Sequence, residues 1–231
     1  MQEKELRTTT KQRVIIITIA VLTLASTVLA YLLIVLAGNK SNNTAETSPE
    51  LAALQEEYSQ YQSETNEYAA TLSQQYLEEF KGYKSRVKAY NATTANSDGL
   101  KTVDLKEGTG RELTEGDTDY FAYYIGWCAD EAIFDSSFND SNDPTALNTP
   151  LAAGIGLIEG WNQGVIGMKI GGVREISIPA ELAYGDTQEI CGTTNSPLKF
   201  IVMPIADDKL SELSKKMEKT YNEMVEKISS N

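Results

Sequence analysis

The segment from Leu157 to Met168 constrains the fold most, because it places a tryptophan between glycines in a short apolar stretch. It reads Leu-Ile-Glu-Gly-Trp-Asn-Gln-Gly-Val-Ile-Gly-Met. This is too short for a helix that forms its own core and too apolar for a surface loop. We therefore expect one or two helical turns whose indole, Trp161, inserts into another layer. Such a tryptophan is either ordinary core or the floor of an apolar cup.

Three runs on either side of this segment carry strand signals. Residues 119–127 are rich in aromatic and branched side chains, residues 173–178 alternate, and residues 198–205 form a third such run. Pro204 lies near the far end of the last run, where the sheet can tolerate a residue that has no backbone N–H to donate. Strands with one short helix between them predict an antiparallel sheet wrapped on that helix, an α+β fold.

Charge and residue usage exclude several kinds of chemistry. The 231 residues carry a formal net charge of −13 and include no histidine. An acidic chain without a basic face argues against nucleic acid as a partner. Without histidine the Ser-His-Asp triad and the commonest metal ligand are missing, and two cysteines cannot form a structural zinc site unaided. We therefore expect no cofactor, no metal and little proton transfer in any catalysis.

The N-terminal region predicts a membrane anchor. A polar, basic head over residues 1–13 precedes an unbroken apolar run over residues 14–37. At ~1.5 Å per residue this run spans a hydrocarbon core of ~30 Å. A cleaved signal peptide is the alternative, but its apolar region is shorter, about 7–15 residues. Because basic residues precede the span and acidic ones follow, we expect a single-pass cell-membrane protein with its N-terminus inside.

Beyond a polar linker at residues 38–48, a long amphipathic helix is predicted over residues 49–91. Ser48-Pro49-Glu50 is typical of a helix start. Apolar residues, many of them tyrosines, then recur at steps of three and four, which indicates a coiled-coil-like stalk with a stutter. Residues 92–99 lack an apolar period and are predicted to be a linker.

A second helix is predicted at residues 207–229, again with apolar residues at steps of three and four. We expect it to run back along the stalk helix as an antiparallel pair. The alternative is a stalk that self-associates between chains.

Seven short motifs resemble the FK506-binding-protein (FKBP) family of peptidyl-prolyl cis-trans isomerases in their order and rough spacing. They fall within residues 100–206, a little under half of the chain, and together they are far more specific than any one of them. The motifs are Gly108-Thr109-Gly110, Gly116-Asp117, Tyr124-Ile125-Gly126, Phe134-Asp135-Ser136-Ser137, Ile158-Glu159-Gly160-Trp161, Ala183-Tyr184-Gly185 and Leu198-Lys199-Phe200.

The resemblance implies an isomerase domain and assigns roles in its site; the charges that flank the apolar run are what place this domain outside the membrane. Trp161 is expected to form the pocket floor. The backbone N–H of Ile158 and the hydroxyl of Tyr184 are expected to hold the substrate's carbonyls. Asp135 is expected at the rim beside Tyr124, with its carboxylate facing the amide that is twisted. The expected walls are Tyr124, Phe134, Leu157, Ile158 and Phe200.

This chemistry suits a chain without histidine. Rotation about an X–Pro amide crosses a barrier of ~18–20 kcal/mol, and nothing has to be deprotonated to lower it. A pocket that excludes water and binds the twisted amide better than the planar one accelerates rotation about the X–Pro bond. The implied partners are proline-containing polypeptides and macrolide inhibitors. Two alternatives stay open, a proline-segment binding module or holdase with little turnover, and a structural surface protein whose stalk oligomerises.

The chain departs from the family pattern at three places. The family's Ile-Pro-Pro stretch is replaced by residues 190–195, and residues 149–154 offer only Leu151 where an aromatic is usual. The turn at residues 154–156 is about one residue short. These departures leave substrate preference and macrolide affinity open.

Cys128 and Cys191 are the only thiols of the chain. Both are expected outside the membrane, where disulfides persist. By the resemblance, Cys128 ends a strand near the Asp135 loop and Cys191 lies in the loop after Tyr184. We therefore expect a disulfide that joins two rims of the pocket. The alternative is a pair of unrelated buried thiols.

Overall fold

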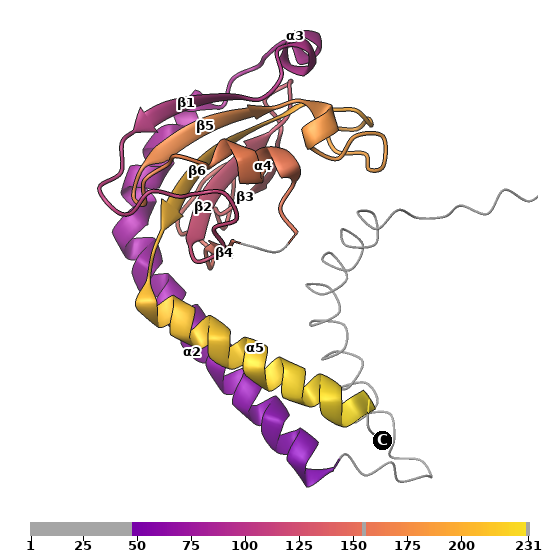
Figure 1. Cartoon of the computed structure of the whole chain (residues 1–231). Coiled ribbons are helices and arrows are strands. Elements are labelled where there is room, and N and C mark those ends of the chain that lie inside the picture. The colour runs from indigo at the N-terminus through magenta and orange to yellow at the C-terminus, as the bar shows by residue number, and fades with distance from the viewer. Residues whose placement is uncertain (1–47, 154–155, 230–231) are drawn as a thin grey trace, which may run out of the picture. The chain divides into compact units, whose positions relative to one another are not determined.

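The structure, a computed structural model, describes residues 48–153 and 156–229 (Figure 1). The predicted head, anchor and most of the first linker therefore lie outside the described residues. Within the described ranges, no helix has both the length and the apolar character needed to cross a membrane.

An antiparallel sheet of six strands forms the centre of the described chain. Its order is β1-β5-β6-β2-β3, and β4 pairs with β2. The prediction of an antiparallel sheet is confirmed; the second and third predicted runs coincide with β5 and β6, and the first begins two residues later than predicted. The strands are β1 (Lys101–Lys106), β2 (Phe121–Trp127), β3 (Ile133–Ser136), β4 (Leu151–Ala152), β5 (Val173–Ile178) and β6 (Leu198–Ile205).

Both faces of this sheet are apolar, as β2 shows most clearly. Tyr123, Ile125 and Trp127 belong to a buried cluster on one face. Ala122 and Tyr124 belong to a second cluster on the other face. Because successive side chains of a strand point to opposite faces, a strand of this composition needs a cover on each side. Figure 1 shows a long helix, α2, along one face and a short helix, α4, across the other.

The C-terminal half of helix α2 (Pro49–Gly82) covers the first face. Phe80 is fully buried, and its ring centroid lies 6.1 Å from that of Tyr123 and 5.6 Å from that of Phe138. Tyr76 packs at 5.8 Å from Tyr123. The prediction of a coiled-coil-like seam is therefore wrong for this half of the helix, because its rings pack on a sheet and not on a second helix.

The stalk helix also ends earlier than predicted, at Gly82 instead of residue 91. A 3-10 turn, Tyr83–Arg86, follows. The chain then runs extended along the sheet, and the backbone N–H of Tyr90 donates to the carbonyl of Ala129 at 3.0 Å. We call residues 83–90 the strap. Bonds to the sheet replace the helical bonds that the apolar period had suggested.

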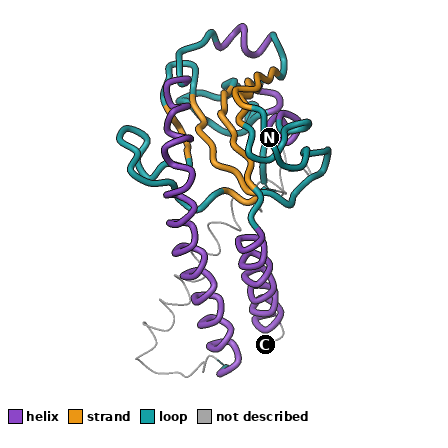
Figure 2. Tube along the Cα trace, turned by 90° about the vertical axis from the view of Figure 1, so that its left-hand side faces the viewer, coloured by secondary structure: helices purple, strands orange, loops and turns teal. Residues whose placement is uncertain are grey.

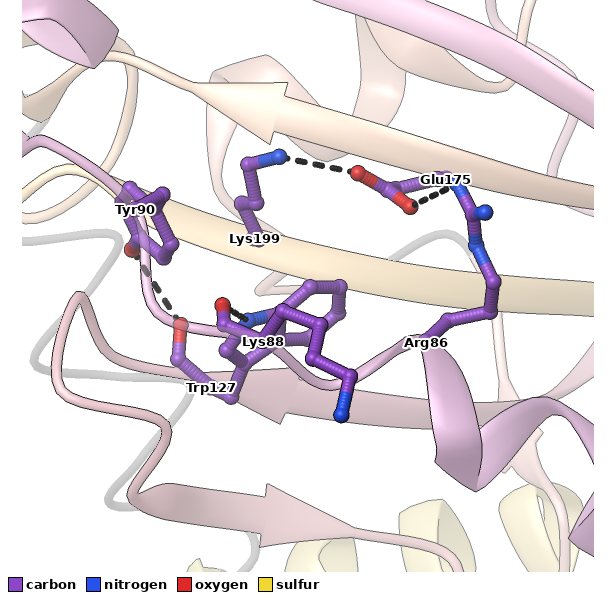
Figure 3. Close-up of polar contacts among 6 residues, drawn as sticks. All are labelled: Arg86, Lys88, Tyr90, Trp127, Glu175 and Lys199. Atoms are coloured by element: carbon purple, nitrogen blue, oxygen red, sulfur yellow. Dashed lines mark hydrogen bonds and ion pairs between the residues drawn. The ribbon is translucent and has the colours of Figure 1, made fainter.

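Polar contacts fix the strap to the same face (Figure 3). The carboxylate of Glu175 on β5 accepts from Arg86 of the strap at 3.1 Å and from Lys199 of β6 at 2.8 Å. The indole N–H of Trp127 donates to the carbonyl of Lys88 at 3.1 Å. The strap therefore contacts β5 and β2 directly, and Glu175 links it to Lys199 of β6.

The predicted linker at residues 92–99 contains a helix, α3 (Ala92–Ser97). The side chain of Asn91 accepts a hydrogen bond from the N–H of Thr94 at 2.8 Å, which is an N-cap. Ala95 is buried. A single helix of this length is too short to show an apolar period, so the pattern could not reveal it.

Helix α5 (Asp208–Ser229) runs antiparallel to the N-terminal half of α2, as predicted. Lys227, near the end of α5, forms an ion pair with Glu50 at the start of α2. At the other end, Asp207 accepts a hydrogen bond from the hydroxyl of Tyr68 at 2.8 Å. Figure 2 shows both helices extending beyond the same end of the sheet.

Phe80→Ala is expected to destabilise the protein by about 3–5 kcal/mol, because it leaves a cavity between α2 and the sheet. Urea unfolding followed by circular dichroism measures this change, with Gln74→Ala on the exposed side of α2 as the control. A loss below about 1 kcal/mol would show that α2 lies on the sheet without stabilising it.

Candidate active site

Helix α4 (Glu159–Gly164) carries Trp161 and lies in close contact with β5. A Cβ at Gly160 would lie 2.2 Å from Cγ2 of Ile178, and one at Gly164 would lie 2.6 Å from Cγ2 of Ile176. Glycine at both positions is therefore required for the helix to lie this close to the strand. The prediction of a short helix whose indole enters another layer is confirmed.

Four aromatic rings meet beside α4. The Trp161 ring lies 5.6 Å from Tyr124 and 5.4 Å from Phe200, and Phe134 lies 5.6 Å from Phe200. All three pairs are edge-on, with interplanar angles of 82°, 79° and 90°, which is a favoured geometry for aromatic pairs. A Cβ at Gly126 would lie 2.8 Å from both phenylalanine rings, so this glycine makes room for the cluster.

Trp161 is only 2% exposed in this structure. Tyr124 and Phe200 pack against its ring, and its indole N–H donates to the hydroxyl of Tyr120 at 3.3 Å. The tryptophan is therefore the buried base of the cluster and not an open floor. Side chains of the cluster that are partly exposed are Tyr124, Phe134, Leu157, Ile158 and Tyr184.

Asp135 and two tyrosines share one rim of this cluster. The Tyr124 hydroxyl donates to Oδ2 of the exposed Asp135 at 2.7 Å. Burial, this hydrogen bond and the charge of Asp135 raise the pKa of Tyr124, and burial and the charge of Asp135 raise the pKa of Tyr184. Both phenols therefore stay protonated at neutral pH and can donate hydrogen bonds.

Two donors of the predicted site have no partner within the described residues. They are the backbone N–H of Ile158, at the N-cap of α4, and the hydroxyl of Tyr184. The carbonyl of Ile158, by contrast, accepts from the N–H groups of Trp161 and Asn162. The geometry leaves both donors available to a ligand.

The predicted disulfide between Cys128 and Cys191 is confirmed, with the two Cα atoms 5.7 Å apart. It joins the end of β2 to the loop that follows Tyr184. The replacement for the family's Ile-Pro-Pro stretch is thus cross-linked to the sheet. The short turn of the sequence lies partly outside the described residues, since positions 154 and 155 are not among them.

The structure therefore brings the residues predicted for the site into one apolar cluster with one polar rim. Sequence reasoning missed Tyr120, which supports the indole. The signal was present, because Tyr120, Ala122 and Tyr124 follow the two-residue period of a strand face. The predicted residues that come together are Tyr124, Phe134, Asp135, Leu157, Ile158, Trp161, Tyr184 and Phe200.

Comparison with known proteins gives the class. Residues 110–203 match the model of the FKBP-type peptidyl-prolyl cis-trans isomerases. An FK506-binding protein of Neisseria meningitidis serogroup B is 40% identical over 88 residues, which are 38% of this chain and 75% of the relative. An FK506-binding protein of Streptomyces anulatus is 45% identical over 88 residues, 38% of this chain and 67% of the relative.

Among solved structures, the crystal structure of AtFKBP13 is similar at 31% identity and a TM-score of 0.37, over 48% of this chain and 95% of that chain. The present chain belongs to the FKBP-type peptidyl-prolyl cis-trans isomerase family. The class predicted from the seven motifs is confirmed.

Opening the disulfide is expected to lower the free energy of unfolding by about 4 kcal/mol in the chain-entropy model, since it closes a loop with a sequence separation of 63. Denaturant unfolding with and without reductant measures the loss. The double variant Cys128→Ser/Cys191→Ser is the control, and reductant should leave its stability unchanged. Equal stability of the native protein in both conditions would contradict the prediction.

Proposed function

We propose that this isomerase acts on X–Pro bonds of extracytoplasmic polypeptides, as a folding factor tethered to a membrane. The observation that carries the mechanism is the hydrogen bond of 2.7 Å between Tyr124 and Asp135 at the rim of the aromatic cluster. It places a carboxylate beside the apolar surface of the aromatic cluster. Amide rotation on such a surface requires no proton transfer.

The apolar part of the site would receive the prolyl ring. We infer that the ring packs on Tyr124, Phe134 and Leu157, above the buried Trp161. This contact removes water from the amide carbonyl, which disfavours the charge-separated form with its partly double C–N bond. Rotation becomes faster only if the twisted amide is bound better than the planar one.

The carboxylate of Asp135 would supply that difference, and two hydrogen-bond donors would hold the substrate in the ground and transition states alike. The N–H of Ile158 and the hydroxyl of Tyr184 donate to carbonyls that flank the proline and hold the backbone in place. The carboxylate of Asp135, fixed by Tyr124, faces the amide as it twists. No step moves a proton, which is consistent with a chain that has no histidine.

A protease-coupled assay on a proline peptide tests this proposal. The native protein should speed isomerisation, and Asp135→Val should lower kcat/KM by about tenfold to a hundredfold, because the rim charge is lost. Trp161→Ala should abolish activity by removing the base of the cluster. Asp143→Val, on an exposed loop, is the matched control and should behave as the native protein does.

The assay also separates the holdase alternative. A holdase would bind the peptide and leave the isomers to relax at their uncatalysed rate, and that result would contradict the proposed catalysis. Macrolide binding and self-association through the helices stay predictions, which ligand titration and sedimentation address separately.

The location rests on two observations, the apolar run at residues 14–37 and the disulfide. Protease added to intact cells, after removal of any outer barrier, should cleave the isomerase domain while a cytoplasmic marker survives. Protection of the domain until the membrane is lysed would contradict the extracytoplasmic location.

A further inference from the structure

The loop that carries Tyr184 is closed at its base by short backbone bonds. The N–H of Gly185 donates to the carbonyl of Ala180 at 2.9 Å, and the N–H of Asn195 donates to the carbonyl of Gly185 at 2.7 Å. Asn195 has a positive φ of 54°, which is uncommon outside glycine. Beyond these bonds, the disulfide at Cys191 and one further side chain hold the loop.

One side chain from outside the family region reaches both arms. Oδ1 of Asn96, on α3, accepts the N–H of Ala180 at 2.8 Å. Nδ2 of the same side chain donates to the carbonyl of Asn195 at 3.3 Å. Ala180 begins the 3-10 turn Ala180–Leu182 just before Tyr184, and Asn195 lies on the return to β6.

Helix α3 is itself held in place. Its N-cap and its buried Ala95 fix it locally. The strap anchors its start, because the hydroxyl of Tyr90 donates to the carbonyl of Pro197 at 2.8 Å. Figure 1 shows α3 at the end of the sheet where this loop lies. The position of Asn96 is therefore set by the segment that precedes the family domain.

We propose that Asn96 is a positioning residue for the isomerase site, which fixes the loop that presents the Tyr184 hydroxyl. The inference rests on the proposed role of Tyr184. Asn96 touches no substrate; it acts through Ala180 and Asn195. Loss of its side chain removes the partners of the Ala180 N–H and the Asn195 carbonyl. The disulfide at Cys191 still holds the loop, but the hydroxyl then samples positions from which it cannot reach the substrate's carbonyl.

The test compares Asn96→Ala, Asn96→Asp and Thr93→Ala in the full chain. Asn96→Ala should raise KM for a proline peptide about tenfold with kcat within about twofold, because a hydroxyl that holds the substrate in both ground and transition states is displaced. Asn96→Asp keeps the acceptor for Ala180 and should restore KM to within about threefold of the native value. Thr93→Ala, on the same helix, should match the native protein.

Amide hydrogen exchange supplies a readout that does not depend on activity. The Ala180 N–H should lose protection in Asn96→Ala and keep it in Asn96→Asp. The proposal is overturned if KM and Ala180 protection are unchanged in Asn96→Ala, or if Asn96→Asp is impaired to the same extent. If Asn96→Ala does not fold, Asn96→Ser takes its place, and failure of both to fold overturns a purely positioning role. An inactive native protein would instead contradict the proposed function.

Discussion

The structure depends on a sheet that is apolar on both faces, so each face must be covered by another element. Along β2, Tyr123 and Trp127 point to one side and Tyr124 to the other, so one strand serves two cores. Burial of apolar surface is the dominant favourable contribution to folding, and an uncovered face of this composition would expose a large apolar patch. Helix α4 covers the side that carries the site, and α2 with the strap covers the opposite side.

This arrangement makes the C-terminal half of α2 and the strap part of the isomerase fold, although the family match begins only at residue 110. The rings of Tyr76 and Phe80 pack on the back of the strand whose front carries Tyr124. Because a closely packed interior transmits displacement, a shift of α2 would displace the side chains of the aromatic cluster. On the face that α2 covers, Glu175 also forms ion pairs with Arg86 of the strap and Lys199 of β6.

The sequence predicted the parts whose signal is local and long enough. β5 was predicted from alternation, β6 from a run of strand-forming residues, α5 from its apolar period, and the grouping of the candidate site residues from motifs. The docking of α2 could not be predicted, because a helix shows the same period whether its stripe packs on a helix or on a sheet. The strap and α3 were missed because tertiary contacts of Tyr90 and an N-cap at Asn91 decide their conformation. The burial of Trp161 depends on ring packing, which no linear pattern encodes.

The coupling of the two faces is tested most directly by native-state hydrogen exchange of the full chain. We expect the amides of residues 72–80 in α2 and those of β2 to exchange through one shared opening, with the same free energy. If the α2 amides exchange with a free energy far below that of β2, the helix is an attachment to an independent domain, and the claim that the sheet requires two covers is contradicted.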